Sequence, residues 1–360
     1  MLLILAALVA QLPAAAPPPA PVTAAATAWP IREGEVTLTD FRFKSGEALP
    51  KLRMHYTTLG APRRDGSGRI ANAVLLLHGT GGSGKQFLQP QFADQLFGPG
   101  EPLDIARYFI VMPDNIGHGA SSKPSDGLRM AFPKYDYDDM VEAQRQMLRG
   151  LGVAQLRLIL GTSMGCMHIF AWGETHPDFA RALMPLACQP VEIAGLNRLW
   201  RQLLIDGIKA DPAWQGGKYT AQPQQGLRTA QSLLIVAGAA PLYFQAQYPT
   251  RDAAGAAAQD RVAKALPKLD ANDMIYQFES SRNYNPWPRL EAITAPMMWV
   301  NSADDFINPR NFDFPQAAVR RMRNARFRLI PETADTRGHG THTWAVNSKA
   351  DLSELLARTE

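Results

Sequence analysis

The chain has 360 residues, of which 46% are hydrophobic and 19% charged. It can therefore bury a substantial hydrophobic core and does not need disulfides or metal ions to be stable. Lysine and arginine number 37 against 33 for aspartate and glutamate, which leaves a formal charge of +4 spread thinly along the chain. This composition argues against a disordered protein and against a nucleic-acid-binding protein.

The N-terminal segment differs in composition from the rest. Met1 to Ala10 is an apolar run with the length of a signal-peptide core, too short for a membrane span of about 20 residues. An Ala/Pro-rich stretch follows to about Pro30, and no Lys or Arg precedes Arg32. We expect residues 1–30 to be a signal peptide and leader. The protein would then be exported, periplasmic or secreted, with no stable membrane anchor.

The pattern after residue 31 is an alternation of strands and helices. Eight short apolar runs bounded by turn residues are predicted strands: Glu35–Thr39, Arg53–Leu59, Ala73–Leu77, Tyr108–Met112, Leu156–Leu160, Ala182–Leu186, Met297–Val300 and Arg326–Ile330. Helical periodicity marks Asp138–Leu151 and Met164–Glu174. This alternation predicts a mostly parallel eight-stranded sheet with helices on both faces, an α/β fold. The first two runs have no helix between them and predict an antiparallel hairpin at one edge.

A long segment after Ala187 breaks this alternation. Residues 190–290 contain no clear strand and are rich in Trp, Gln, Ala and Pro, so we predict a helical cap inserted between core segments 31–189 and 291–360. Trp200 and Tyr243 in the cap are candidate substrate-binding residues, which suggests an apolar acyl or alcohol group.

The chain has two cysteines, Cys166 and Cys188. They exclude an all-cysteine zinc site, and at most one disulfide can form. Because both lie in strongly apolar surroundings, we expect two small buried hydrophobic residues rather than a disulfide.

The strongest chemical signal is Gly161-Thr162-Ser163-Met164-Gly165, which directly follows a predicted strand and precedes a predicted helix. G-x-S-x-G in this setting is typical of a nucleophile elbow, a sharp turn in which glycines avoid clashes. Ser163 is therefore the predicted nucleophile.

A serine hydroxyl needs a general base, and the base needs a carboxylate to orient it. Asp305 follows the seventh predicted strand and has a proline four residues on, so we prefer it to Asp304, which we expect to be a solvated loop carboxylate. His339 lies between glycines in the loop after the eighth strand and is preferred to His342. The two histidines lack an acidic partner at ligand spacing, so we predict no metal site.

The glycine-rich loop His78–Gly82 follows the third predicted strand. Backbone N–H groups in such a loop, together with the amide after the nucleophile, form the oxyanion hole of serine enzymes. We predict Thr80 and Met164 as the two donors, with Gly81 as the alternative to Thr80 and a candidate substrate-binding residue.

These motifs together resemble the α/β-hydrolase fold, and within it the homoserine O-acetyltransferase-like proteins. The similarity rests on Gly161–Met167, Asp139–Gln144, Leu269–Tyr276 and Gly338-His339. It implies a triad of Ser163, Asp305 and His339 and an acyl-enzyme intermediate.

Two departures from that family favour water as the acyl acceptor. In the acetyltransferases a Thr-Tyr-Arg-Ser stretch supplies an arginine for the homoserine carboxylate, whereas this chain has Ala237-Gly238-Ala239-Ala240. Export also takes a protein away from acetyl-CoA. If an amino-acid acceptor is nevertheless used, Arg228 and Arg198 in the cap are the first arginines to test.

The sequence therefore predicts an exported serine hydrolase that cleaves a small-molecule ester or amide without cofactor or metal. One alternative is an acyltransferase that uses the same triad. The other is a non-catalytic binding protein on the hydrolase fold. The oligomeric state stays open, with a dimer among the alternatives.

Overall fold

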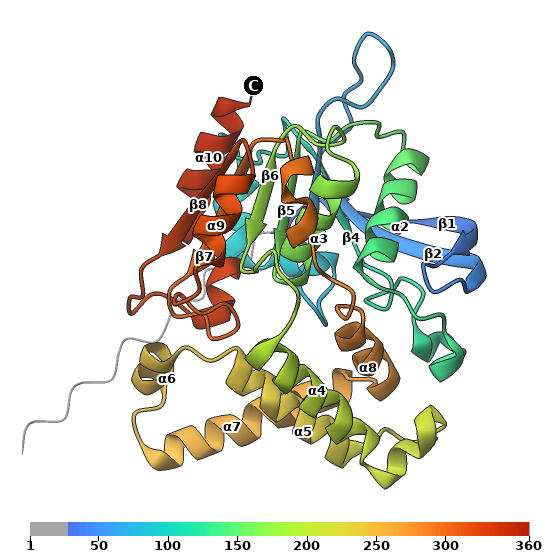
Figure 1. Ribbon diagram of the computed structural model, residues 1–360, viewed down its shortest axis with the longest axis vertical. Helices are drawn as coiled ribbons and strands as arrows, with labels where there is room; N and C mark the ends of the chain where they lie inside the picture. The colour runs from blue at the N-terminus through green and yellow to red at the C-terminus, as the bar shows by residue number, and fades with distance from the viewer. Residues whose placement is uncertain (1–27, 360) are drawn as a thin grey trace, which may run out of the picture.

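The computed structural model describes residues 28–359, so residues 1–27 of the predicted signal peptide and leader lie outside that range. An eight-stranded sheet with strand order β1-β2-β4-β3-β5-β6-β7-β8 forms its centre (Figure 1). The strands are β1 Arg32–Arg42, β2 Ala48–Leu59, β3 Ala73–Leu77, β4 Phe109–Pro113, β5 Leu158–Thr162, β6 Leu183–Leu186, β7 Met297–Ser302 and β8 Ala325–Ile330. All eight predicted strands are confirmed.

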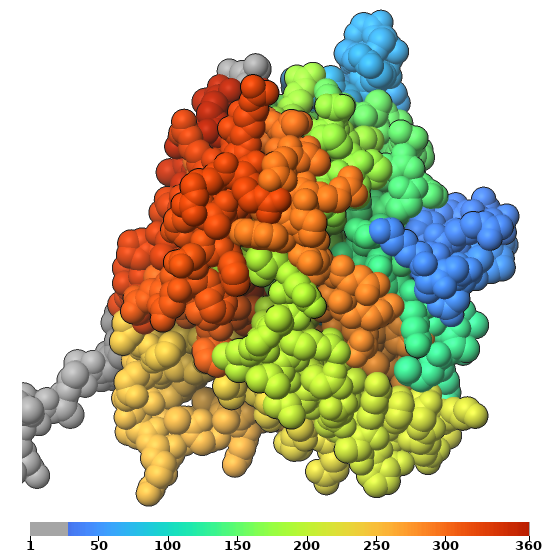
Figure 2. All heavy atoms as spheres, viewed as in Figure 1, coloured from blue at the N-terminus to red at the C-terminus, as the bar shows by residue number. Residues whose placement is uncertain are grey.

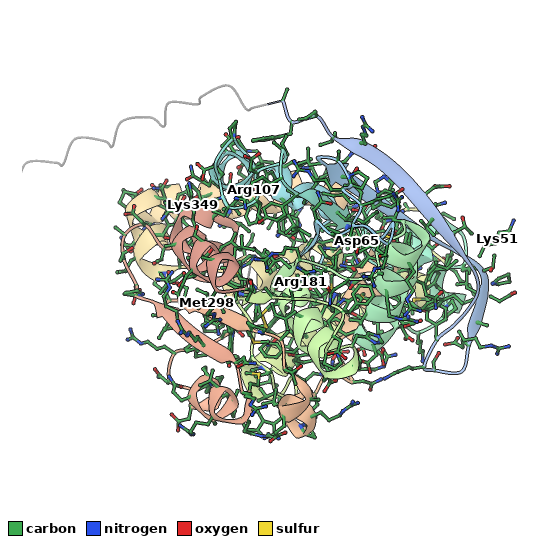
Figure 3. The ribbon with its side chains drawn as sticks, turned by 90° about the horizontal axis from the view of Figure 1, so that it is seen from above. Lys51, Asp65, Arg107, Arg181, Met298 and Lys349 are labelled. Atoms are coloured by element: carbon green, nitrogen blue, oxygen red, sulfur yellow. A yellow bond between two sulfur atoms is a disulfide. The ribbon has the colours of Figure 1, made fainter. Side chains whose placement is uncertain are left out.

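The sheet is parallel except at one edge. β1 pairs with β2, and β2 with β4, in antiparallel register, while the pairs from β4 across to β8 are parallel. In the view from above, Lys51 on β2 lies at the outer rim of this antiparallel edge (Figure 3). β1 and β2 can pair in antiparallel register because a short turn joins them. Two parallel strands need a longer crossover connection, which is usually a helix.

Helices cover both faces of the sheet because the strands alternate their apolar side chains. On β3, Ala73, Leu75 and Leu77 join one buried cluster, whereas Val74 and Leu76 join another. The first cluster includes side chains of α2 (Tyr137–Gly150), α3 (Met164–Thr175) and α9 (Phe314–Arg321). The second includes those of α1 (Pro90–Leu96) and α10 (Lys349–Arg358). The α/β fold class is confirmed.

The two helices predicted by periodicity correspond to α2 and α3. The first turn of α2 is closed by Asp136, whose side chain accepts hydrogen bonds from the backbone of Asp138 and Asp139. The side chain of Asp139 in turn accepts a hydrogen bond from the backbone N–H of Asp136, which completes a capping box. α3 begins directly at Met164, so the elbow serine stands at its N-terminus.

The insertion after β6 folds as helices at one end of the sheet (Figures 1 and 2). Its α-helices are α4 Gly195–Lys209, α5 Gln224–Ala237, α6 Pro241–Gln247, α7 Arg251–Ala265 and α8 Ala271–Glu279. They enclose a hydrophobic cluster of their own, which includes Leu204, Ile208, Leu227 and Ile275. This cap faces the carboxyl ends of the parallel strands, where open α/β sheets bind ligands.

The expectation for the cysteines is wrong in one respect. Cys166 on α3 and Cys188 after β6 are both buried, as expected, but they are joined in a disulfide. The partners are 22 residues apart in sequence. They meet because α3 packs against β6, a contact that their apolar surroundings alone do not reveal.

Within residues 28–359, no helix has the length and apolar character that a bilayer-spanning segment needs. Over the same range, His, Cys, Asp and Glu side chains form no group of three or more that could hold a metal ion.

Candidate active site

Ser163 stands on a strained turn between β5 and α3. Its backbone has φ 54° and ψ −109°, a conformation that non-glycine residues rarely adopt. The two flanking glycines make the turn sterically feasible. A Cβ on Gly161 would lie 2.3 Å from the carbonyl oxygen of Gly165, and one on Gly165 would lie 2.0 Å from that of Leu77. The turn therefore pushes the serine side chain out of the sheet at its carboxyl end.

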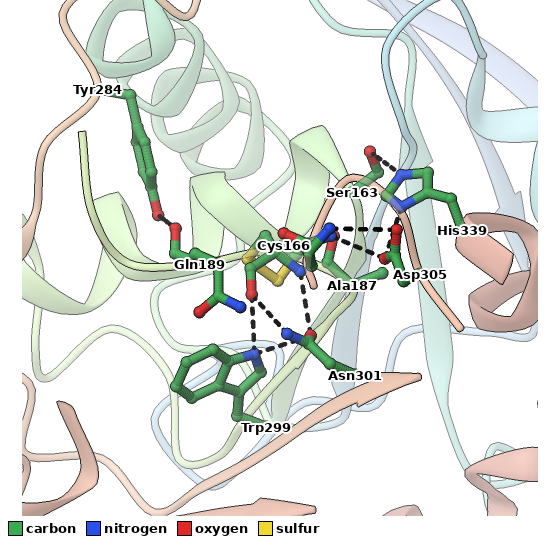
Figure 4. Close-up of a disulfide and its surroundings, with 11 residues drawn as sticks. Ser163, Cys166, Ala187, Gln189, Tyr284, Trp299, Asn301, Asp305 and His339 are labelled. Carbon is green, nitrogen blue, oxygen red and sulfur yellow. Dashed lines mark hydrogen bonds and ion pairs between the residues drawn. A yellow bond between two sulfur atoms is a disulfide. The ribbon is translucent and has the colours of Figure 1, made fainter. Parts of the chain in front are cut away.

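Ser163, His339 and Asp305 form a continuous hydrogen-bond chain (Figure 4). Nε2 of His339 lies 2.8 Å from Oγ of Ser163, and Nδ1 lies 2.8 Å from Oδ2 of Asp305. Because an ionised carboxylate only accepts, Nδ1 carries the proton and Nε2 is left to accept from the serine hydroxyl. The three predicted residues thus come together from the ends of β5, β7 and β8.

Asp305 is completely enclosed, with a side chain that is 0% exposed. Burial alone raises the pKa of its carboxyl group, but the neighbouring His339 and the hydrogen bonds from Asn308 and Ile307 bring the pKa below its ordinary value. The Asn308 amide donates to Oδ2 at 2.8 Å and the Ile307 backbone to Oδ1 at 2.8 Å. The carboxylate is therefore held ionised and in one orientation.

Asp304 is not the solvated loop carboxylate that the sequence predicted. Its Oδ2 accepts a hydrogen bond from the Gly338 backbone at 2.8 Å, and its Oδ1 accepts one from the Ser302 hydroxyl. Gly338 directly precedes His339 and has φ 58°, which favours glycine. Asp304 thus ties the loop of the histidine to the loop of the acid.

His342, the alternative base, lies behind His339. The two rings are 4.9 Å apart between centroids. Burial and the neighbouring His339 lower the pKa of His342 to about 3, so it stays neutral. Among the described residues, its Nδ1 has no hydrogen-bond partner. The geometry therefore places His339, not His342, against the serine.

The glycine-rich loop after β3 lies directly beside the serine. A Cβ on Gly79 would be 3.3 Å from the Cβ of Ser163. Gln86 holds this loop, since its Oε1 accepts from the Gly79 backbone at 3.2 Å and its Nε2 donates to Thr162 Oγ1 at 2.8 Å. Sequence analysis missed Gln86. The loop carries the predicted donors Thr80 and Gly81, the latter with φ 74°.

The other predicted donor is the backbone N–H of Met164. Met164 is the first residue of α3, where backbone N–H groups have no partner within the helix. The positive end of the helix dipole adds to its capacity to bind a negative charge. The predicted donors thus come from two elements, the N-terminus of α3 and the loop after β3.

A cavity of about 380 Å³ contains Ser163 and His339 in its wall. Its lining is mainly apolar and comes from α3, the segment after β6, the loop after β7 and the start of α9: Met167, Val191, Ile193, Phe306, Ile307, Phe312 and Phe314. A second cavity of about 810 Å³ is lined by Thr80 and Gly81, by lysines and by residues of α8. Ser163 thus lines the first cavity, and the glycine-rich loop after β3 lines the second.

The two aromatic residues predicted to bind substrate do not line the cavity that holds Ser163. Trp200 is 7% exposed and packs into the core of the cap, with Phe278 at 5.6 Å between ring centroids. Tyr243 stacks on the guanidinium of Arg337, 4.0 Å from its ring centroid. These two assignments are corrected: Trp200 stabilises the cap, and Tyr243 contacts the loop that leads to His339.

Comparison with known proteins places these features in a family. Residues 72–333 match the family described as alpha/beta hydrolase fold. The chain is 36% identical over 214 residues to a homoserine O-acetyltransferase of Moorella thermoacetica, which covers 54% of this chain and 55% of that protein. It is 28% identical over 348 residues to a homoserine O-acetyltransferase of Chloroherpeton thalassium, 88% and 86% of the two chains. The first match thus spans about half the length of the curated relative.

Solved structures with a similar fold carry two kinds of name. The homoserine O-acetyltransferase from Bacillus anthracis superposes with a TM-score of 0.79 at 19% identity, covering 91% of this chain and 98% of that one. An acetylester hydrolase from Corynebacterium glutamicum superposes with a TM-score of 0.79 at 20% identity, covering 91% and 96%. At these identities the likeness concerns the fold.

Proposed function

Because the chain belongs to the α/β-hydrolase fold family, in its homoserine O-acetyltransferase-like branch, we propose that it opens an ester through an acyl-enzyme on Ser163. The observation that carries this proposal is the hydrogen-bond chain from Ser163 through His339 to the buried Asp305. A serine needs such a base and orienting carboxylate to act as a nucleophile at neutral pH.

In this proposal each group has a defined role. Ser163 Oγ attacks the ester carbonyl carbon while His339 Nε2 takes the hydroxyl proton. The carbonyl oxygen becomes negative and is stabilised by the amides of Met164 and Thr80. The bond to the alcohol then breaks, and His339 returns the proton to the departing alcohol oxygen. Asp305 keeps the imidazole oriented and stabilises its positive charge throughout.

Water is the acyl acceptor in this proposal. It attacks the acyl-enzyme, His339 takes its proton, and the released Ser163 oxygen receives that proton as the acid leaves. The segment Ala237–Ala240 supports water, since it lacks the arginine that the resemblance to the acetyltransferases implies at this position for the acceptor carboxylate. The Ala239 carbonyl also packs closely against Gly338, where an added Cβ would approach it to 2.5 Å.

Acyl transfer to an alcohol is the second candidate, favoured by the names of the matching relatives. Mass spectrometry of the products, with acetyl-CoA and homoserine both present, separates the two. We expect ester hydrolysis without any acceptor and no O-acetylhomoserine above background. Formation of O-acetylhomoserine faster than free acetate would establish the transferase instead.

A fluorophosphonate probe tests whether the site reacts at all. We expect covalent labelling of Ser163 in the wild-type protein and none in Ser163→Ala, with p-nitrophenyl esters of graded chain length reporting turnover. No labelling of correctly folded protein would leave the non-catalytic alternative.

We also propose that the protein is exported. The apolar run at Leu2–Val9 supports this, and so does the Cys166–Cys188 disulfide, because stable disulfides are typical of oxidising compartments. The intact mass of protein recovered from its native host is the test. We expect a mature start between Gln11 and Trp29, and retention of Met1 in cytoplasmic protein would contradict export.

A further inference from the structure

A buried arginine lines the cavity that contains Ser163. Arg201 lies on α4 and is 3% exposed, and its guanidinium carbon is 4.8 Å from the ring centroid of Trp200 and 5.5 Å from that of Phe278. Its Nε donates to Asn197 Oδ1 at 2.8 Å and one terminal nitrogen to Ser281 Oγ at 3.3 Å. Both partners are neutral, and together they use two of the five N–H donors of the guanidinium.

This guanidinium has no carboxylate partner within residues 28–359. The nearby Glu279 pairs instead with Arg198, at 3.7 Å. Glu192 also lines the cavity, but it is exposed to solvent. Burial lowers the pKa of Arg201, yet arginine stays protonated in proteins. A buried charge without a counter-charge is unfavourable, so binding of an anion from outside is favoured there.

A second buried group beside Arg201 also lacks a partner. The hydroxyl of Tyr137 is enclosed, with the residue 2% exposed, and among the described residues its neighbours Arg201, Ser281 and Thr80 do not reach full hydrogen-bond geometry with it. Burial raises the pKa of Tyr137, and the neighbouring Arg201, Ser281 and Thr80 oppose that rise. Arg201 and an unsatisfied hydroxyl therefore lie together, next to the loop that carries the predicted oxyanion donor.

We propose that Arg201 binds a carboxylate of the substrate, so that the ester opened at Ser163 is an anionic one. This inference rests on the proposed function, since it places the carboxylate in the cavity shared by Arg201, Ser163 and His339. The free N–H donors of the guanidinium match a carboxylate in number and geometry, and the Tyr137 hydroxyl can donate to the same group. The apolar remainder of the wall contacts the hydrocarbon part of the substrate.

Sequence analysis named two other arginines for the case of an amino-acid acceptor, and neither lies where Arg201 does. Arg198 is three residues earlier on α4, is 35% exposed along its side chain and has its own acidic partner. Arg228 on α5 is exposed. Neither lines the cavity that holds Ser163.

Matched pairs of charged and neutral substrates test the proposal. On the acyl side, 4-nitrophenyl hydrogen succinate is compared with 4-nitrophenyl levulinate, in which a methyl ketone replaces the carboxylate. On the alcohol side, 3-acetoxypropanoate is compared with 4-acetoxybutan-2-one. We expect wild-type kcat/KM to favour the charged member of one pair, and that pair identifies the side of the ester that carries the carboxylate.

The Arg201→Gln variant separates binding from structure. We expect kcat/KM for the favoured charged substrate to fall by about tenfold to a hundredfold, and for its neutral partner by less than about threefold. Arg201→Lys, which keeps the charge but loses the planar fork, should recover part of the loss. Arg228→Gln is the control and should match wild type. An equal loss for both members of the pair, or the same selective loss in Arg198→Gln, would overturn the proposal.

A binding measurement keeps this inference separate from the catalytic proposal. In the Ser163→Ala protein, monomethyl succinate should raise the melting temperature more than methyl levulinate does, and Arg201→Gln should remove the difference. That result without any ester turnover by the wild type would retain the anion site and reject the hydrolase. If the wild type hydrolyses esters with no preference for the charged member of either pair, the hydrolase proposal is retained and the anion site is rejected.

Discussion

Asp304 holds the backbone of Gly338, the residue before His339, with a 2.8 Å hydrogen bond from the Gly338 N–H to Oδ2. The adjacent residue, Asp305, holds the His339 ring with a second hydrogen bond of 2.8 Å. Two successive acidic residues after β7 therefore fix one histidine, the first through its loop and the second through its side chain. The dipeptide works as a unit, although only Asp305 touches the imidazole.

We therefore predict that Asp304→Ala lowers kcat by about tenfold or more, because a small displacement of the imidazole weakens its hydrogen bond with Ser163. Asp304→Asn should retain most of the activity, since its amide oxygen can still accept from Gly338. Steady-state kinetics with a p-nitrophenyl ester give the comparison. Equal activity of the Ala and wild-type proteins would show that Asp304 does not position the loop.

The hydrogen-bond chain itself predicts strong non-additivity. Ser163→Ala and His339→Ala should each reduce kcat by about a thousandfold or more, and the double variant should lose little beyond either single one. His342→Ala serves as the matched control in the same loop and should keep substantial activity, because His342 does not contact Ser163. Activity lost in His342→Ala but kept in His339→Ala would transfer the role of base to His342.

Local patterns predicted the strands and the elbow, because each depends on residues that are adjacent in sequence. Ser163 lies between two glycines that any strand-to-helix turn of this kind requires. The cysteine pairing, in contrast, depends on how α3 packs on β6, and no local pattern encodes that contact. The Asp304 hydrogen bond likewise joins two loops that are 34 residues apart.

In the cap, the buried stripe of α4 follows a regular spacing in the sequence. Trp200, Leu204 and Ile208 recur every four residues on α4 and form its buried stripe. That spacing predicts a core position for Trp200 rather than a place in the substrate site. Arg201 is next to this stripe, so the same spacing predicts that Arg201 is buried. The spacing does not predict that Arg201 lines the cavity containing Ser163, because that depends on how the cap packs over the sheet.

A buried histidine predicts a pH-dependent stability. His118 is 1% exposed, its Nδ1–H donates to the Ile116 carbonyl at 2.9 Å, and burial together with the neighbouring His78 lowers its pKa to about 3. In the unfolded chain its pKa is about 6.5. Below that pH the unfolded chain binds a proton that the folded chain refuses, so stability falls as the pH drops from about 6.5 towards 3.

His118→Asn should isolate this effect, because asparagine can keep the donor to Ile116 but does not titrate. We expect the free energy of unfolding of the wild type to fall by about 1 kcal/mol per pH unit more than that of the variant, between about pH 6 and pH 4. Urea unfolding curves at several pH values provide the slopes. Parallel pH profiles for the two proteins would show that His118 takes up its proton without unfolding.

The disulfide predicts a redox-dependent stability at the wall of the active-site cavity. Cys188 follows β6, lines the cavity and is fixed further by Asn301, whose side chain bonds both its backbone N–H and its carbonyl (Figure 4). Cys166 is on α3, three residues after Ser163. The disulfide therefore joins α3, the helix that begins directly after Ser163, to the segment that leads into the cap.

Closing a loop between residues 22 apart stabilises a fold by about 3 kcal/mol, because the unfolded chain loses conformational freedom. We predict that the Cys166→Ala/Cys188→Ala double variant loses about that much free energy of unfolding. Wild-type protein unfolded and refolded in dithiothreitol should show a comparable loss, whereas the double variant should be indifferent to the reductant. Because the disulfide is buried, the folded wild type should resist the same reductant without denaturant. The contrary outcome is that the wild-type unfolding curves with and without reductant are identical although both thiols are shown to be reduced. Packing of α3 on β6 would then be sufficient to stabilise this part of the cavity wall.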